Sequence, residues 1–267
     1  MRIATAPPSG VKRIADAFAD SGKRAAFMPY LMGGFPDLAT SCGIGEAYAA
    51  SGADLVELGV PFSDPLADGP VIQAAGTAAL EAGATVEDVL RVGGVLAGSV
   101  PVIVMAYANL VLARGTEVFA RDLAASEISG LIVPDLPMEE APALLAACDA
   151  EGVALVPLVA PTTTDERLAE IGPRARGFLY TVSVTGTTGE RNALDGLAAV
   201  VARARTHAGV PVAVGFGIST PEHAAAAAVA GADGVIVGSR LVRAAAEADD
   251  PPGAVAALVG GFAAALR

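Results

Sequence analysis

Short apolar runs alternate with amphipathic segments along the whole chain. Eight runs of strand-forming residues have the length of buried strands, and they cover residues 26–32, 54–58, 102–106, 130–134, 153–159, 177–182, 212–216 and 235–237. The segments between them have helical periodicity and include residues 41–50, 71–82, 117–126, 139–150, 165–171, 195–208 and 221–230. A repeated strand–helix order predicts a parallel sheet, because parallel neighbours need a crossover connection.

Eight strand–helix units in 267 residues favour a closed (β/α)₈ TIM barrel over an open sheet. A further helix is predicted over residues 10–20, before the first strand, where it can cover the barrel floor, and a last helix over 253–266. No linker rich in Pro, Gly and Ser interrupts the pattern. Residues 1–267 are therefore expected to form a single α/β domain, one TIM barrel with an extra N-terminal helix.

Composition and charge narrow the range of partners. The formal net charge is −12, which argues against a nucleic-acid site and against an anionic membrane surface. The N-terminus lacks the apolar core of a signal peptide, and no run of about 20 apolar residues is present. The two cysteines, Cys42 and Cys148, fall in predicted helices and are expected to be free thiols. These features favour the cytoplasm.

The candidate chemistry is concentrated after the second strand. The apolar run there ends on Glu57, and the loop that follows holds Asp64 and Asp68. Glu is seldom buried without a partner or a task, and acids at the end of a barrel strand suit proton transfer. The two aspartates lie in turn-forming sequences, so a purely structural role is the plainer interpretation for them. Glu57 is the leading candidate, with Asp68 or Asp64 as its partner.

A phosphate site is predicted at the ends of the last three strands. A polar loop with two glycines covers residues 183–192, and the next two strands lead into Gly217 and into Gly238-Ser239, where the sequence Gly-Ser-Arg is predicted to open a helix. Glycines let backbone N–H groups approach a phosphate, most effectively at a helix N-terminus. One such loop is ordinary turn chemistry, but three at one end of a barrel indicate a site for a phosphorylated molecule.

Several other mechanisms lack the residues they need. The only lysines, Lys12 and Lys23, precede the first strand, so a barrel Schiff base is not expected. The only histidines, His207 and His223, lie on predicted outer helices, which disfavours a histidine-based metal centre or nucleophile pair. No metal is therefore expected. Carboxylate acid–base catalysis on a phosphorylated small molecule remains.

The chain resembles the α-subunit family of tryptophan synthase from end to end. The most specific segment is ELGVPFSDPLADGP at residues 57–70. The others are PYLMGGFPD at 29–37, YANL at 107–110, PDLP at 134–137, YTVSVTGTTG at 180–189 and GFGI at 215–218.

This resemblance implies a lyase that cleaves indole-3-glycerol phosphate to indole and glyceraldehyde 3-phosphate. Glu57 and Asp68 match the catalytic pair: Glu57 would protonate indole C3 and take the proton of the 3′-hydroxyl, and Asp68 would accept the indole N–H. Thr188 would hydrogen-bond Asp68 when its loop closes. The positions that match the substrate and phosphate site are Tyr30, Tyr180, Thr188, Gly189, Phe216, Gly217, Gly238 and Ser239.

The resemblance also implies a partner, a β-subunit that receives the indole within an α₂β₂ heterotetramer. Pyridoxal phosphate belongs to that subunit, so no cofactor is expected in this chain. The contact face would include Pro61, Asn109, Leu110 and Pro137. Phe35 and Thr187 differ from what many members carry, which bears on communication between subunits.

Three other interpretations stay open from the sequence. A free-standing indole-glycerol-phosphate lyase would keep the same site residues without needing a partner. A catalytically silent activator of a β-subunit is disfavoured by the presence of both acids and of the phosphate glycines. Another phosphosugar barrel, such as an isomerase or epimerase, is disfavoured because no His or Lys stands at a strand end.

Overall fold

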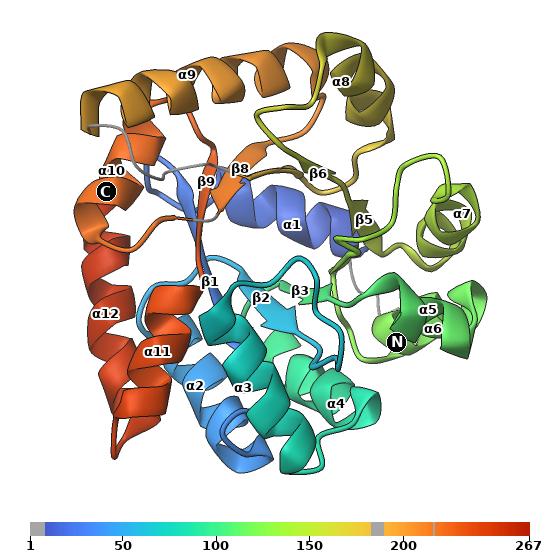
Figure 1. Cartoon of the computed structure of the whole chain (residues 1–267), viewed down its shortest axis with the longest axis vertical. Helices are drawn as coiled ribbons and strands as arrows, with labels where there is room; N and C mark the ends of the chain where they lie inside the picture. Colours follow the sequence, from blue (N-terminus) through green and yellow to red (C-terminus); the bar gives the residue numbers. More distant parts are fainter. Residues whose placement is uncertain (1–8, 183–189, 216) are drawn as a thin grey trace, which may run out of the picture.

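Parallel strands form a barrel at the centre of the molecule, and helices surround it (Figure 1). The computed structural model describes residues 9–182, 190–215 and 217–267, without the side chains of residues 190–195. The strands, each paired in parallel with its neighbours, are β1 (Ala26–Met32), β2 (Val56–Gly59), β3 (Val102–Met105), β4 (Gly130–Ile132), β5 (Ala154–Val156), β6 (Leu158–Val159), β7 (Leu179–Val182), β8 (Val212–Gly215) and β9 (Gly234–Val237).

The barrel closes at Pro157. The sequence predicts one strand over 153–159, but the structure divides it into β5, which pairs with β4, and β6, which pairs with β7. Proline causes the division because it has no N–H to donate to a neighbouring strand. Its carbonyl still accepts the N–H of Tyr180 at 3.0 Å. The nine strands therefore occupy eight positions around the barrel, and the predicted TIM fold is confirmed.

The helices fall where the sequence predicts them, with two additions. They are α1 (Gly10–Ala19), α2 (Leu38–Ala50), α3 (Pro70–Glu81), α4 (Val86–Ala97), α5 (Ala108–Arg114), α6 (Thr116–Ala125), α7 (Pro142–Glu151), α8 (Asp165–Ile171), the 3₁₀ turn η1 (Gly172–Arg174), α9 (Glu190–His207), α10 (Pro221–Val229), α11 (Ser239–Glu247) and α12 (Pro251–Ala265). The sequence analysis did not predict α4 and α5. Within the described residues, every helix is too short or too polar to span a bilayer.

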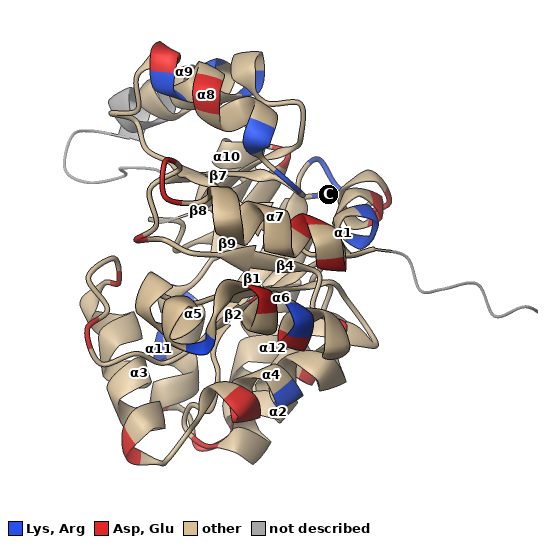
Figure 2. Ribbon diagram, turned by 90° about the vertical axis from the view of Figure 1, so that its right-hand side faces the viewer, with Lys and Arg blue, Asp and Glu red and all other residues tan. Residues whose placement is uncertain are grey.

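The N-terminal helix α1 covers the floor of the barrel, as predicted. Ile14 is fully buried and belongs to the apolar cluster inside the barrel. The Phe18 ring lies 5.7 Å from the Phe178 ring, just before β7. Figure 2 shows α1 at one end of the barrel and the loop between β2 and α3 at the other. With the floor covered, the carboxyl ends of the strands form the open end.

Alternation along each strand determines which side chains face the barrel interior. In β1, Met28 and Tyr30 belong to the inner cluster, whereas Phe27 and Leu31 pack against the helices. The same alternation applies to β2, where Val56 and Leu58 face outward. Glu57 lies between them and therefore faces the interior, in register with Tyr30 of β1 and Ile103 of β3.

Two Gly-Ala-Asp sequences fix the starts of strands. The Asp54 carboxylate accepts the Phe27 N–H at 2.7 Å and pairs with Lys23 Nζ at 2.7 Å. Asp233 accepts the Val212 N–H at 2.9 Å and pairs with Arg205 at 2.6 Å. Each carboxylate thus satisfies a backbone N–H at the beginning of the neighbouring strand and holds that strand in register.

We expect Asp54→Ala to lower the free energy of unfolding by about 3 kcal/mol, because the Lys23 charge and the Phe27 N–H lose their shared acceptor. The side chains of the Lys23–Asp54 pair are only 9% and 11% exposed. The matched control is Asp16→Ala, which breaks a Lys12–Asp16 pair whose side chains are 64% and 48% exposed and should change little. Urea unfolding of both variants measures the difference, and equal losses would contradict this role for Asp54.

Candidate functional site

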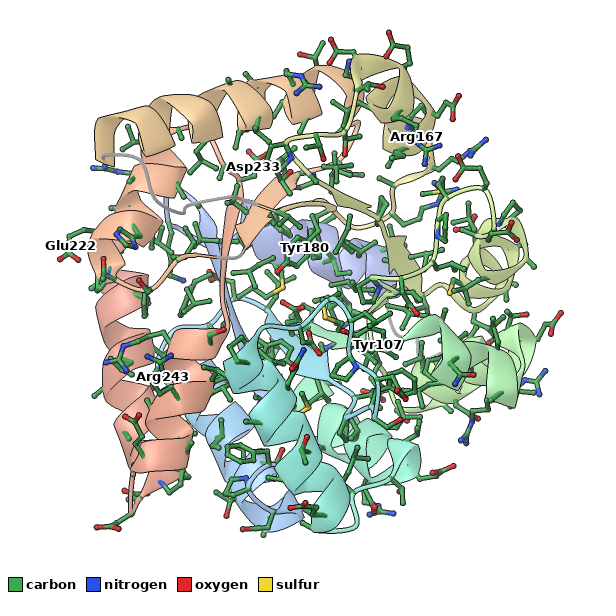
Figure 3. All side chains as sticks on the ribbon, viewed as in Figure 1. Tyr107, Arg167, Tyr180, Glu222, Asp233 and Arg243 are labelled. Atoms are coloured by element: carbon green, nitrogen blue, oxygen red, sulfur yellow. The ribbon has the colours of Figure 1, made fainter. Side chains whose placement is uncertain are left out.

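A cavity of about 240 Å³ lies at the open end of the barrel. Its walls come from strands β1, β2, β3, β7 and β9, the loop between β2 and α3, the segment after β8 and the start of α11. The lining residues are Tyr30, Glu57, Asp68, Gly69, Ile72, Met105, Tyr180, Gly217, Ile218, Ser219, Ile236, Gly238, Ser239 and Arg240. Figure 3 shows Tyr107 and Tyr180 within the ring of helices, and Glu222 outside it.

Glu57 is the buried acid of this cavity. It is 1% exposed, and its Oε2 atom has no hydrogen-bond partner among the described residues. Burial raises the pKa of Glu57 to about 8, and the nearby charge of Asp68 adds to the effect. The carboxyl group is therefore mostly protonated near neutral pH. A neutral carboxyl that reaches into a cavity with a free oxygen can donate a proton to a bound molecule.

Two tyrosines complete the inner wall around Glu57. Tyr30 and Tyr180 are 6% and 3% exposed, and both line the cavity. Their pKa values are raised well above the ordinary value, by burial first and then by the neighbouring carboxyl groups. Glycines make room for both rings, since a Cβ at Gly59 would collide with the Tyr30 hydroxyl and one at Gly215 with the Tyr180 hydroxyl.

Asp68 reaches the cavity from the loop after β2, and Tyr107 holds it there. Burial raises the pKa of Asp68, whereas a hydrogen bond from the Tyr107 hydroxyl lowers it by favouring the carboxylate. The same hydroxyl accepts the Ala67 N–H at 3.0 Å. The Tyr107 ring stacks on Phe62 with ring centres 5.2 Å apart. Tyr107 thus fastens the loop at Phe62 and at Ala67, directly before Asp68.

The structure separates the two aspartates of this loop. Asp68 is among the residues that line the cavity, and Asp64 is not. Asp64 is exposed, and its carboxylate accepts the hydroxyl of the adjacent Ser63 at 2.6 Å. Of the two partners considered for Glu57, the geometry therefore brings Asp68 to it. Asp64 has the local hydrogen bonding typical of a turn residue.

The opposite end of the cavity is formed by backbone and by one cation. Gly217, Gly238, Ser239 and Arg240 meet there. Helix α11 begins at Ser239, and the first N–H groups of a helix have no acceptor within the helix. Gly217 has a φ of 73°, a conformation that favours glycine. Of the other residues predicted for this region, Thr187, Thr188, Gly189 and Phe216 lie outside the described residues.

The residues predicted for a partner surface differ in exposure. Asn109 and Pro137 are exposed, and Leu110 is half-buried against the core. Pro61 is buried within the chain itself, so it offers little surface to another protein. Two apolar side chains near these positions are strongly exposed, Leu66 at 91% and Leu112 at 61%.

Sequence reasoning assigned no role in the site to Tyr107 or to Arg240. Tyr107 directly follows β3, and its contact with Asp68 depends on a loop 40 residues away. Arg240 follows Gly238-Ser239, so the Gly-Ser-Arg sequence at a predicted helix start was its only signal. His, Cys, Asp and Glu form no group of three suited to a metal ion in the described part of the chain.

Comparisons with known proteins identify the family of this chain. A family model described as tryptophan synthase alpha chain matches residues 17–260. The tryptophan synthase alpha chain of Prochlorococcus marinus (strain MIT 9313) is 49% identical over 247 residues, which covers 91% of this chain and 89% of the relative.

Solved structures give the same result. A chain of Mycobacterium tuberculosis tryptophan synthase superposes with a TM-score of 0.88 and 40% identity, covering 98% of this chain and 99% of that chain. The tryptophan synthase subunit alpha of Legionella pneumophila str. Paris superposes with a TM-score of 0.88 and 35% identity, covering 97% of this chain and 99% of that chain.

The pKa of Glu57 predicts how stability depends on pH. The pKa is about 8 in the folded state and 4.5 in an ordinary glutamate, so between these pH values the folded state keeps a proton that the unfolded chain has released. The contribution of this proton to the free energy of unfolding is fully present below pH 4.5 and is lost as pH rises through 8.

The side chain in Glu57→Gln stays neutral at every pH, so the variant does not lose stability in this way. We expect wild type and variant to be similar in urea unfolding at low pH, and wild type to be less stable by several kcal/mol at high pH. A stability difference that does not vary with pH would contradict a raised Glu57 pKa.

Proposed function

This chain belongs to the tryptophan synthase α-chain family, and we propose that Glu57 and Asp68 are the acid–base pair with which it cleaves its substrate. It has the function of that family, that of a lyase of tryptophan biosynthesis that catalyses the α reaction. In that reaction indole-3-glycerol phosphate is split into indole and glyceraldehyde 3-phosphate. The observation that carries the proposal is the buried Glu57 carboxyl, which lines the cavity with a free oxygen.

The cleavage makes an aromatic carbon a leaving group, so the ring must first be activated. The neutral Glu57 carboxyl donates its proton to indole C3 and the ring becomes a cationic indolenine. The resulting carboxylate then takes the proton of the substrate's 3′-hydroxyl while the bond between C3 and the glycerol chain breaks. The glycerol carbon becomes an aldehyde, indole regains its aromatic ring, and Glu57 is protonated again.

Asp68 is proposed to accept the indole N–H and to stabilise the positive charge that forms on the ring. This role requires a carboxylate, and the hydrogen bond from Tyr107 favours that form. The two acids therefore work in opposite protonation states because their surroundings differ: Glu57 is fully enclosed in the barrel, whereas Asp68 lies on a loop with a phenol donor. Tyr30 and Tyr180 would line the pocket for the substrate.

We propose that the substrate phosphate binds at the other end of the cavity. Gly217, Gly238 and Ser239 line this end, and the N-terminus of α11 directs backbone N–H groups and the positive end of the helix dipole toward it. Thr188, Gly189 and Phe216, which the family resemblance also assigns to substrate, lie outside the described residues.

The family implies a β-subunit partner, and we propose an α₂β₂ heterotetramer in which indole passes between subunits. The proposed contact face is the open end of the barrel around Asn109, Leu110 and Pro137, and the exposed Leu66 and Leu112 support it. Pro61 is buried and is proposed only as a support for the loop.

We further propose that this chain carries no cofactor and that pyridoxal phosphate belongs to the β-subunit. The complex is proposed to act in the cytoplasm, where the free thiols of this chain would stay reduced.

Removing the Glu57 carboxyl tests the catalytic role. Glu57→Gln should lower the rate of indole release from indole-3-glycerol phosphate by at least about 10³-fold, because both proton transfers lose their carrier. Asp68→Asn should be similarly damaging. The matched controls are Glu81→Gln, exposed on α3, and Asp64→Asn, in the same loop but outside the cavity. A Glu57→Gln enzyme that keeps a tenth of wild-type turnover would exclude the proposed role, and an active Asp68→Asn with an inactive Asp64→Asn would transfer the second role to Asp64.

The partner proposal predicts that a β-subunit increases indole release by at least about ten-fold. Leu112→Asp should weaken the apparent affinity for that subunit about ten-fold or more, because it puts a charge into an apolar contact, and should leave the rate of the isolated chain unchanged. Val229→Asp, an equally large change at a side chain 76% exposed on α10, is the control. Titration of the rate with β-subunit measures both. Fast release by the isolated chain that the β-subunit does not alter would identify a free-standing lyase instead.

A further inference from the structure

The two ends of the cavity have opposite electrostatic character. Glu57 and Asp68 form one end, and Gly238, Ser239 and Arg240 form the other. The acidic end already points to a ligand, because Glu57 is 1% exposed and its Oε2 atom is left without a described partner. A molecule that spans the cavity therefore meets hydrogen-bonding acids on one side and positive charge on the other.

Arg240 supplies that positive charge. It is the only cationic residue among those that line the cavity in the described part of the chain. It is exposed, and none of the acidic side chains that the structure describes forms an ion pair with it. Two arginines of α9 are paired, by contrast: Arg203 with Asp165 and Arg205 with Asp233. The guanidinium of Arg240 is thus available to a ligand.

The negative charge of this protein makes a cation at this place important for binding a phosphorylated substrate. The chain has a formal net charge of −12, and Asp68 lines its cavity as a carboxylate in the proposed mechanism, so a phosphate dianion meets repulsion on approach. Backbone N–H groups at the start of α11 offer only partial charges. A guanidinium beside them adds a full charge and two parallel N–H donors that match two phosphate oxygens.

We propose that Arg240 binds the substrate phosphate and gives this site its preference for a phosphorylated over an unphosphorylated indole-glycerol. This inference rests on the proposed function. By fixing the phosphate beside α11, Arg240 directs the indole ring toward Glu57 and Asp68. Arg240 is a binding and specificity residue, and it takes no part in the proton transfers.

Arg243 provides a matched control. It lies one turn further along α11, is exposed, and does not line the cavity (Figure 3). Arg240→Ala and Arg243→Ala therefore make the same change in net charge on the same helix, and only the first changes the cavity wall. Arg240→Lys keeps the charge but loses the paired N–H donors.

The test compares indole release from indole-3-glycerol phosphate and from unphosphorylated indole-3-glycerol by the full chain. Arg240→Ala should raise KM for the phosphorylated substrate at least about ten-fold and change kcat less than about three-fold. Cleavage of the unphosphorylated compound should stay within about two-fold of wild type. Arg240→Lys should give an intermediate KM, and Arg243→Ala should behave as wild type with both substrates.

A binding measurement separates this inference from the proposed function. Titration calorimetry with inorganic phosphate should give a dissociation constant at least about ten-fold weaker for Arg240→Ala than for wild type and for Arg243→Ala. Equal phosphate binding by all three proteins would overturn the role of Arg240, even if Glu57→Gln remains inactive. An equal loss with both substrates would also overturn it, because it would indicate a damaged cavity. Weaker phosphate binding in a protein that releases no indole would uphold Arg240 and contradict the proposed function.

Discussion

The rest of the site depends on the removal of one carboxyl group from water. Glu57 occupies an inward position of β2, and its neighbours in register, Tyr30 and Ile103, are also buried. An ionised carboxylate in such surroundings is costly, so the group stays protonated to about pH 8. Near neutral pH the group therefore still carries a proton that it can donate to a bound substrate. A solvent-exposed glutamate, with an ordinary pKa of 4.5, would be ionised at neutral pH.

The barrel makes this burial possible and limits it to one end. Helix α1 covers the floor with Ile14, so the interior below Glu57 is filled by packed side chains. A cavity remains where the strands end, and there the loop with Asp68 and the start of α11 complete the walls. Burial raises the pKa of Asp68 as well, but Asp68 is only half-buried, and the hydrogen bond that Tyr107 donates to it lowers the pKa and favours the carboxylate. The two acids of this cavity can therefore hold different protonation states.

Sequence periodicity was sufficient for features that depend on local order. It predicted the closed barrel, the helix α1 at its floor and the strand that ends near Glu57, because alternation and strand–helix order are properties of neighbouring residues. It did not predict the division at Pro157, since a seven-residue apolar run looks like one strand until its two neighbours are known. The start of helix α4 could have been predicted from the sequence, because Thr85 and Asp88 form a capping box there. The contact between Tyr107 and the loop of Asp68 joins distant segments, and no local pattern contains it.

The protonation state of Glu57 is the central claim, and infrared spectroscopy measures it directly. The difference between the spectra of wild type and Glu57→Gln isolates the carboxyl band of this one residue. At pH 7 the spectrum should contain the C=O stretch of a protonated acid, and this band should give way to carboxylate bands with a midpoint near pH 8. Carboxylate bands already complete at pH 6 would contradict the account, because Glu57 would then hold no proton to donate to the indole ring.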